Sequence, residues 1–103
     1  NMAEPDVKDE KNVQKGLTKT IEVSVKTPGE EPIKFRVKAT SKFEKVANAF
    51  GKQLGVDPSK FKFLDAEGQR IAKQTGWSKT MEELGIENED TIDAMLEQTG
   101  GRE

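Results

Sequence analysis

Hydrophobic and polar residues alternate in two short segments in the first half of the chain. The first covers residues 20–26 and the second residues 33–38. Such alternation is typical of half-buried strands, and Thr27–Glu30 supplies turn residues between them. The two segments therefore predict a hairpin. Its apolar members are Ile21, Val23 and Val25 in the first segment and Ile33, Phe35 and Val37 in the second.

A helical pattern follows the hairpin. Apolar residues recur at helical spacing from Lys42 to Leu54, and Gly55 stands where a left-handed C-terminal cap is favoured. Ser41 and Glu44 have capping-box spacing, so we expect the Ser41 hydroxyl to accept a hydrogen bond from the Glu44 amide. The helix should lay its apolar stripe across the hairpin. The stripe consists of Phe43, Val46, Ala47, Ala49, Phe50 and Leu54.

The second half of the chain predicts shorter elements. Lys60–Leu64 and Gln69–Ala72 are candidate strands, Thr80–Glu83 has a second capping-box pattern that begins one helical turn, and Asp90–Leu96 is a candidate final strand. The resulting order in so short a chain indicates an α+β fold, a ubiquitin-like β-grasp with a mixed sheet of four to five strands packed on one main helix.

Composition sets the domain organisation. A chain of 103 residues allows one small domain, and 35% of its residues are charged. Residues 1–19 hold few large apolar side chains, so we expect a disordered arm there. We place the ubiquitin-like domain at residues 20–97 and a flexible tail at residues 98–103.

Absent residue types exclude several kinds of chemistry. The chain has no cysteine, histidine or tyrosine, which rules out His-dependent and Cys-dependent catalysis and thiolate or imidazole metal sites. We expect no catalytic residues, no metal and no cofactor. The net charge of -2 gives no general attraction to nucleic acid or anionic membranes. Without an apolar run of transmembrane length or a hydrophobic signal core, we expect a soluble intracellular protein.

The sequence Gln98-Thr99-Gly100-Gly101 follows the last predicted strand. Adjacent glycines carry no Cβ, so a narrow enzyme channel could reach the Gly101 carbonyl without steric conflict. A frayed terminus is the alternative interpretation, since chain ends are commonly disordered.

Several segments together resemble the small ubiquitin-related modifiers (SUMO), and the resemblance extends from about Ile21 to Gly101. The Gln-Thr-Gly-Gly ending is its most specific part, because ubiquitin has an arginine before its glycines. Extra residues in Asp65–Gly68 and Thr75–Ser78 depart from the family pattern. Trp77 lies in the second of these loops, and we expect its side chain to cover part of the core beneath the loop. The matching segments are Phe35–Thr40, Gly55–Val56, Lys62–Leu64, Gly68–Ala72, Glu83–Gly85, Glu89–Asp93 and Glu97–Gly101.

The resemblance implies a protein modifier that is a substrate of enzymes. A SUMO-specific cysteine protease would cut between Gly101 and Arg102, and the exposed carboxylate would pass through activating and conjugating enzymes and ligases to a target lysine. ATP would be used by the activating enzyme. The resemblance also implies a monomer found in nucleus and cytoplasm. A ubiquitin-like interaction domain that is never conjugated is the alternative. A third hypothesis, an enzyme that uses carboxylates or lysines, is disfavoured because the chain has no histidine, cysteine or tyrosine.

Three further sites are hypotheses. Val7-Lys8-Asp9-Glu10 fits the ψ-K-x-E acceptor pattern, which makes Lys8 a candidate chain-forming lysine. Glu87, Glu89, Asp90 and Asp93 form an acidic stretch that is by default a solvated charge run. The resemblance implies a docking surface for the conjugating enzyme at Glu87, Glu89 and Asp90.

The third site is a groove between the second strand and the helix. An unpaired strand edge flanked by basic groups suits the addition of a hydrophobic peptide strand followed by acidic residues. By resemblance this is the site for SUMO-interaction motifs; the alternative is that its apolar residues are simply core. The groove residues would be Ile33, Lys34, Phe35, Val37, Lys38, Lys45, Val46 and Phe50.

Overall fold

The two alternating segments pair as an antiparallel hairpin. In the computed structural model, which describes residues 19–97, β1 (Thr20–Lys26) pairs with β2 (Ile33–Lys38) so that Val23 lies opposite Phe35. Inward residues of β1 are buried and their neighbours are more exposed, as the period-two pattern requires. The predicted hairpin is therefore confirmed.

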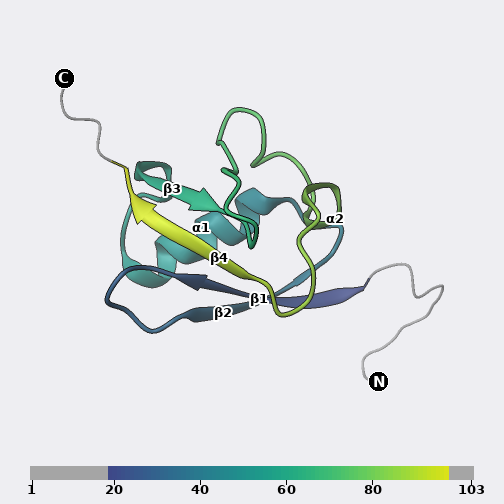
Figure 1. The fold of residues 1–103 in the computed structure, drawn as a ribbon, viewed down its shortest axis with the longest axis horizontal. Coiled ribbons are helices and arrows are strands. Elements are labelled where there is room, and N and C mark those ends of the chain that lie inside the picture. The colour runs from purple at the N-terminus through teal and green to yellow at the C-terminus, as the bar shows by residue number, and fades with distance from the viewer. Residues whose placement is uncertain (1–18, 98–103) are drawn as a thin grey trace.

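The remaining strands complete a mixed sheet in the order β2-β1-β4-β3 (Figure 1). β4 (Thr91–Leu96) lies parallel to β1, and β3 (Phe61–Leu64) lies antiparallel to β4. Helix α1 (Phe43–Leu54) crosses one face of this sheet. Two short helical segments, η2 (Pro58–Lys60) and α2 (Met81–Leu84), lie in the connections. This is the predicted β-grasp arrangement.

Gln69–Ala72 does not form the fifth strand that the sequence allowed. Only an isolated bridge joins Leu64 to Arg70. The Asp65 carboxylate accepts hydrogen bonds from the amides of Glu67 and Gln69, each at 2.9 Å. These bonds hold the turn between the two segments. The chain turns again after Ala72, whose carbonyl accepts from the Gly76 amide, so the pairing ends at Ile71. Within residues 19–97 the sheet thus has four strands.

Helix α1 begins differently from the sequence prediction. Lys42 is its N-cap residue and makes no side-chain capping bond. The amides of Phe43 and Glu44 instead donate to the carbonyls of Lys79 and Trp77, each at 2.9 Å. The Ser41 capping box is therefore wrong, because main-chain acceptors from a distant loop already occupy the first amides. The capping box at α2 is confirmed, with both Thr80–Glu83 hydrogen bonds present.

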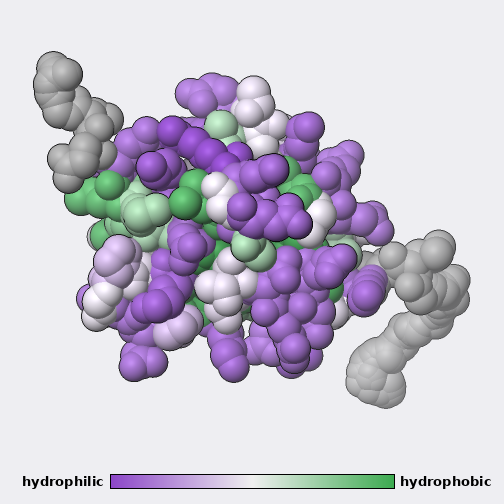
Figure 2. Space-filling view, viewed as in Figure 1, coloured by the Kyte–Doolittle hydropathy of each residue, from purple (hydrophilic) through white to green (hydrophobic). Residues whose placement is uncertain are grey.

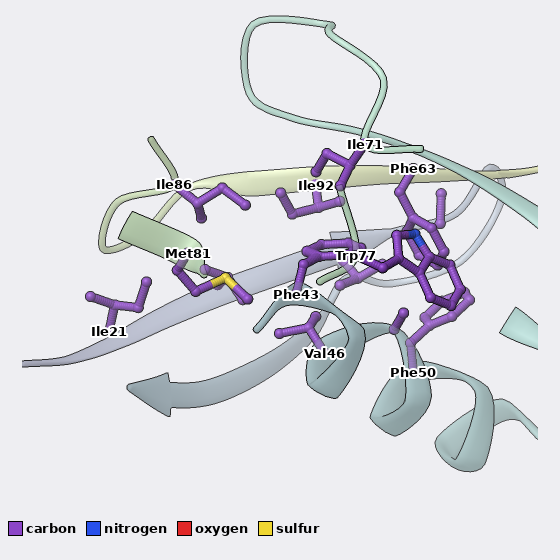
Figure 3. Packing of buried hydrophobic residues seen from close by; sticks show 14 of the residues in the cluster. Ile21, Phe43, Val46, Phe50, Phe63, Ile71, Trp77, Met81, Ile86 and Ile92 are labelled. Carbon is purple, nitrogen blue, oxygen red and sulfur yellow. The ribbon is translucent and has the colours of Figure 1, made fainter. Parts of the chain in front are cut away.

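The core lies between α1 and the sheet, and aromatic rings fill its centre (Figure 3). Phe63 lies 5.4 Å from Phe43, 5.5 Å from Phe50 and 5.8 Å from Trp77 between ring centroids, all in edge-on contacts. Trp77 is only 6% exposed, so it is a core residue and is buried more fully than expected. The loop around Trp77 therefore supplies part of the core, and the Trp77 carbonyl accepts a hydrogen bond from the first turn of α1.

Candidate functional site

The end of β4 is held in place by β3 and by the side chain of Arg70. Leu96 lies opposite Phe61, and the Glu97 amide donates to the Lys60 carbonyl at 2.8 Å. Arg70 Nη2 lies 2.7 Å from Glu97 Oε1. The direction in which the chain leaves the sheet is thus fixed as far as Glu97. Gly100, Gly101, the Gly101–Arg102 bond and Lys8 lie outside the described residues.

β2 is an edge strand, with β1 on one side and no partner strand on the other within residues 19–97. Ile33, Phe35 and Val37 are half-buried on the face that packs toward the core, and Lys34 and Lys38 are exposed on alternate positions. An edge of this kind offers main-chain donors and acceptors to an added strand. β2 therefore presents a free strand edge within residues 19–97, with partly accessible apolar side chains beside it, and strand addition there stays a prediction.

Two of the predicted groove residues belong entirely to the core. Val46 and Phe50 both have 0% exposure, so neither can line an open groove. Their positions on α1 point directly at the sheet, where Phe50 contacts Phe61 and Phe63. Lys45, by contrast, is exposed on α1. Of the apolar residues predicted to line the groove, only Ile33, Phe35 and Val37 therefore keep accessible surface.

The acidic stretch forms a turn bonded to β1. Asp90 Oδ2 accepts from the Glu87 amide at 3.0 Å, and Asn88 Oδ1 accepts from the Glu22 amide at 2.8 Å. Glu89 has a left-handed backbone with φ of 72°, and its amide donates to the Glu22 carbonyl. Glu87 and Glu89 are exposed, whereas Asp90 is half-buried. The two exposed glutamates are therefore available to a partner, and Asp90 has a structural role in the turn.

One carboxylate in the described part of the chain has a clearly shifted pKa. The hydroxyl of Ser59 donates to Asp57 Oδ1 at 2.7 Å, and the Ser59 amide donates to the same oxygen at 3.0 Å. These hydrogen bonds stabilise the charged form and lower the pKa of Asp57 from its ordinary value of 3.8. Asp57 caps η2. It therefore has a structural role in the connection before β3.

Comparison with known proteins shows which family the chain belongs to. Residues 21–96 match the family described as ubiquitin-2 like Rad60 SUMO-like (Rad60-SLD). The chain belongs to this SUMO-like family. A solution structure of SUMO from Trypanosoma brucei is 34% identical, with a TM-score of 0.63 over 88% of this chain and 84% of that chain.

Two more distant structures share the fold of this SUMO-like domain. Ubiquitin of Caldiarchaeum subterraneum is 15% identical, with a TM-score of 0.67 over 80% of this chain and 99% of that chain. A designed protein based on ubiquitin is 19% identical, with a TM-score of 0.66 over 82% and 96% of the two chains. At these identities the likeness supports the ubiquitin-like β-grasp alone.

An exposed apolar surface of the SUMO-like domain was not predicted from its sequence. Leu54 and Leu96 were assigned to a buried helical stripe and a half-buried strand, yet they are 39% and 61% exposed. Together with Val56, which is 38% exposed, they line one open pocket of about 430 Å³. Helical and strand periodicity places both leucines on core-facing positions, but it cannot show where the core ends.

The described part of this SUMO-like domain contains no cluster of three or more acidic side chains arranged to hold a metal ion. Among its helices, none has the length and apolar character that crossing a membrane requires.

Proposed function

We propose that this SUMO-like protein is a conjugated modifier, processed after Gly101 and attached through the Gly101 carboxylate to lysines of target proteins. The observation that carries the proposal is the sequence Gln98-Thr99-Gly100-Gly101, which follows a SUMO-like domain after a single residue beyond its last strand. A terminal carboxylate without nearby Cβ atoms suits enzymes that bind it in narrow channels.

In the proposed reaction, the protein is the substrate throughout. The Gly101 carboxylate displaces pyrophosphate from ATP to give an acyl adenylate, and an enzyme thiolate then displaces AMP to give a thioester. A lysine amine of the target displaces the thiolate and forms an isopeptide bond. The catalytic groups belong to the activating and conjugating enzymes, consistent with a modifier that has no cysteine or histidine of its own.

A reconstituted reaction tests the proposal. The full chain is incubated with SUMO-specific protease, activating enzyme and ATP, and mass spectrometry follows the loss of Arg102–Glu103 and the formation of a thioester. We expect both, and we expect deletion of Gly101 to abolish the thioester while peptide binding at β2 is unchanged. A chain that keeps Arg102–Glu103 and forms no thioester would contradict conjugation.

The exposed Glu87 and Glu89 support a second element of the proposal, non-covalent docking of a basic face of the conjugating enzyme. Charged pairs at the rim of an interface mainly raise the association rate. The double substitution Glu87→Gln and Glu89→Gln should therefore slow association and reduce its salt dependence. Asp93→Asn is a suitable control, because Asp93 is an exposed carboxylate on β4. Equal effects of the two variants would argue against specific docking.

A non-conjugated interaction domain is the second candidate function. The observation that favours it is the edge of β2, where half-buried Phe35 and Val37 lie beside a free strand edge in the described residues. This function needs only peptide binding and no reaction at Gly101. The Gly101 deletion therefore separates the two candidates, since it removes conjugation alone.

A further inference from the structure

The exposed apolar surface is concentrated at one end of the domain. Leu54, Val56 and Leu96 are the large hydrophobic residues that the described chain leaves exposed, and all three line the same pocket. They come from the end of α1, the loop after it and the last residue of β4. We call these three residues the tail-base patch. Figure 2 shows hydrophobic surface gathered at this end of the molecule.

The position of Leu96 explains why the tail-base patch is exposed. Leu96 shares a face of β4 with Ile92 and Ala94, which are both fully buried, and yet it is 61% exposed. It lies at the rim of the core beside Leu54, the last residue of α1, so the helix no longer covers it. An exposed leucine on the core face, grouped with two others, is typical of an interaction site.

The chemistry of the pocket favours an apolar occupant. Glu30 is the one charged residue that lines it, and the other lining residues are apolar apart from Thr27. Phe61 and Pro28 extend the apolar wall beside the tail-base patch. A negatively charged partner group would lose hydration here without gaining a counter-charge, whereas an aliphatic or aromatic side chain would remove apolar surface from water.

The tail-base patch lies within a few residues of the proposed reaction. Glu97 is held by Lys60 and Arg70, so four residues separate this fixed point from the end of a chain processed at Gly101. Four extended residues span at most about 14 Å. Any enzyme that holds the Gly101 carboxylate must therefore lie close to the patch.

We propose that the tail-base patch is the docking surface for an apolar side-chain cluster of the activating enzyme that holds the Gly101 carboxylate. The proposal rests on the proposed function and names a partner contact for it. A protease that cuts after Gly101 can grip residues on both sides of the bond. The activating enzyme receives a shorter end, in which only Gln98 and Thr99 carry side chains, so it needs nearby domain surface for recognition.

The test uses the chain ending at Gly101 with activating enzyme and ATP, and measures KM and kcat for thioester formation. We expect Leu96→Ser and Val56→Ser each to raise KM about tenfold while kcat changes little, because an apolar contact is lost outside the reacting centre. Met95→Ser is the matched control, since Met95 lies next to Leu96 on the opposite face of β4. Circular dichroism melting confirms that each variant is folded.

The outcomes are distinguishable. An inactive wild-type chain would overturn the proposed function and this inference with it. An active wild-type chain whose Leu96→Ser and Val56→Ser variants keep the wild-type KM would overturn the docking surface alone. An equal loss in cleavage of the full chain by the protease would overturn the assignment to the activating enzyme. Wild-type dimers that these substitutions dissociate in sedimentation would assign the patch to a second copy and also overturn it.

Discussion

The carbonyl of Trp77 accepts a hydrogen bond of 2.9 Å from the amide of Glu44 in the first turn of α1. The indole of the same residue is buried against Phe43 and Phe63. One loop residue therefore both satisfies a helix amide and fills the core. The loop around Trp77 is consequently part of the folding unit.

The first prediction concerns Trp77. Trp77→Ala should lower the free energy of unfolding by about 3–5 kcal/mol, because it removes a buried aromatic ring and leaves a cavity. Trp77→Phe should cost less, since a ring still contacts Phe43. Urea denaturation followed by circular dichroism measures both. A loss below about 1 kcal/mol for Trp77→Ala would contradict the structural role of the loop.

The two capping-box patterns should respond differently to mutation. Thr80→Ala should lower the free energy of unfolding by about 1 kcal/mol, because the Thr80 hydroxyl accepts from the Glu83 amide. Ser41→Ala should change it by less than about 0.5 kcal/mol, since the first amides of α1 are bonded elsewhere. Chemical denaturation of the two variants side by side checks this. Equal losses would restore Ser41 as the helix cap.

Asp57 should make stability depend on pH in the acid range. Hydrogen bonds from Ser59 lower the pKa of Asp57 in the folded state below 3.8. A depressed pKa contributes stability above the unfolded value, and this contribution is lost as the pH falls through the folded value. The stability difference between wild type and Asp57→Asn should therefore shrink below about pH 3.8.

Ser59→Ala provides the control for Asp57, because it removes the hydroxyl that is the largest cause of the shift. An NMR titration should show the pKa of Asp57 moving up toward 3.8 in this variant. An unchanged titration curve would show that the Ser59 hydroxyl does not stabilise the carboxylate.

The groove residues should separate into binding and stability residues. Phe35→Ala should weaken binding of a hydrophobic-then-acidic peptide about tenfold with modest loss of stability, because Phe35 is half-buried beside an open edge. Phe50→Ala should lower the free energy of unfolding by about 3–5 kcal/mol, since its ring is fully buried.

Calorimetry with the peptide and urea denaturation measure the two effects. Phe61→Ala is the matched control for Phe35, as a half-buried aromatic residue on β3 at the far edge of the sheet. Peptide affinity that falls equally in Phe35→Ala and Phe61→Ala would place the binding site elsewhere.

The acceptor pattern around Lys8 predicts chain formation. In a reconstituted conjugation reaction, Lys8→Arg should strongly reduce polymeric chains while single attachment to a target continues, because arginine cannot form the isopeptide bond. Lys15→Arg is a control in the same segment without the ψ-K-x-E pattern. Full chain formation by Lys8→Arg would remove the hypothesis, and gel electrophoresis distinguishes the products.

The sequence by itself determined the local elements of this protein. Alternation in β1 and β2, the apolar spacing of α1, Gly55 as its left-handed cap and the Thr80 capping box all follow from interactions between residues a few positions apart. Such patterns can be read directly because the period of each element is fixed by its backbone geometry. The segments that resemble SUMO could also be recognised from the sequence, because each is a short run of matching residues.

Tertiary structure alone decided which residues became core and which became surface. Trp77 is buried and its carbonyl accepts from the first turn of α1. Val46 and Phe50 are fully buried, and Leu96 is exposed although it lies on the same face of β4 as Ala94. These outcomes depend on strand order and on where α1 ends over the sheet, which are set by contacts between distant segments. Periodicity indicates which side of a helix or strand faces inward. Only the packing of α1 on the sheet determines which of those inward-facing residues are covered and which remain exposed.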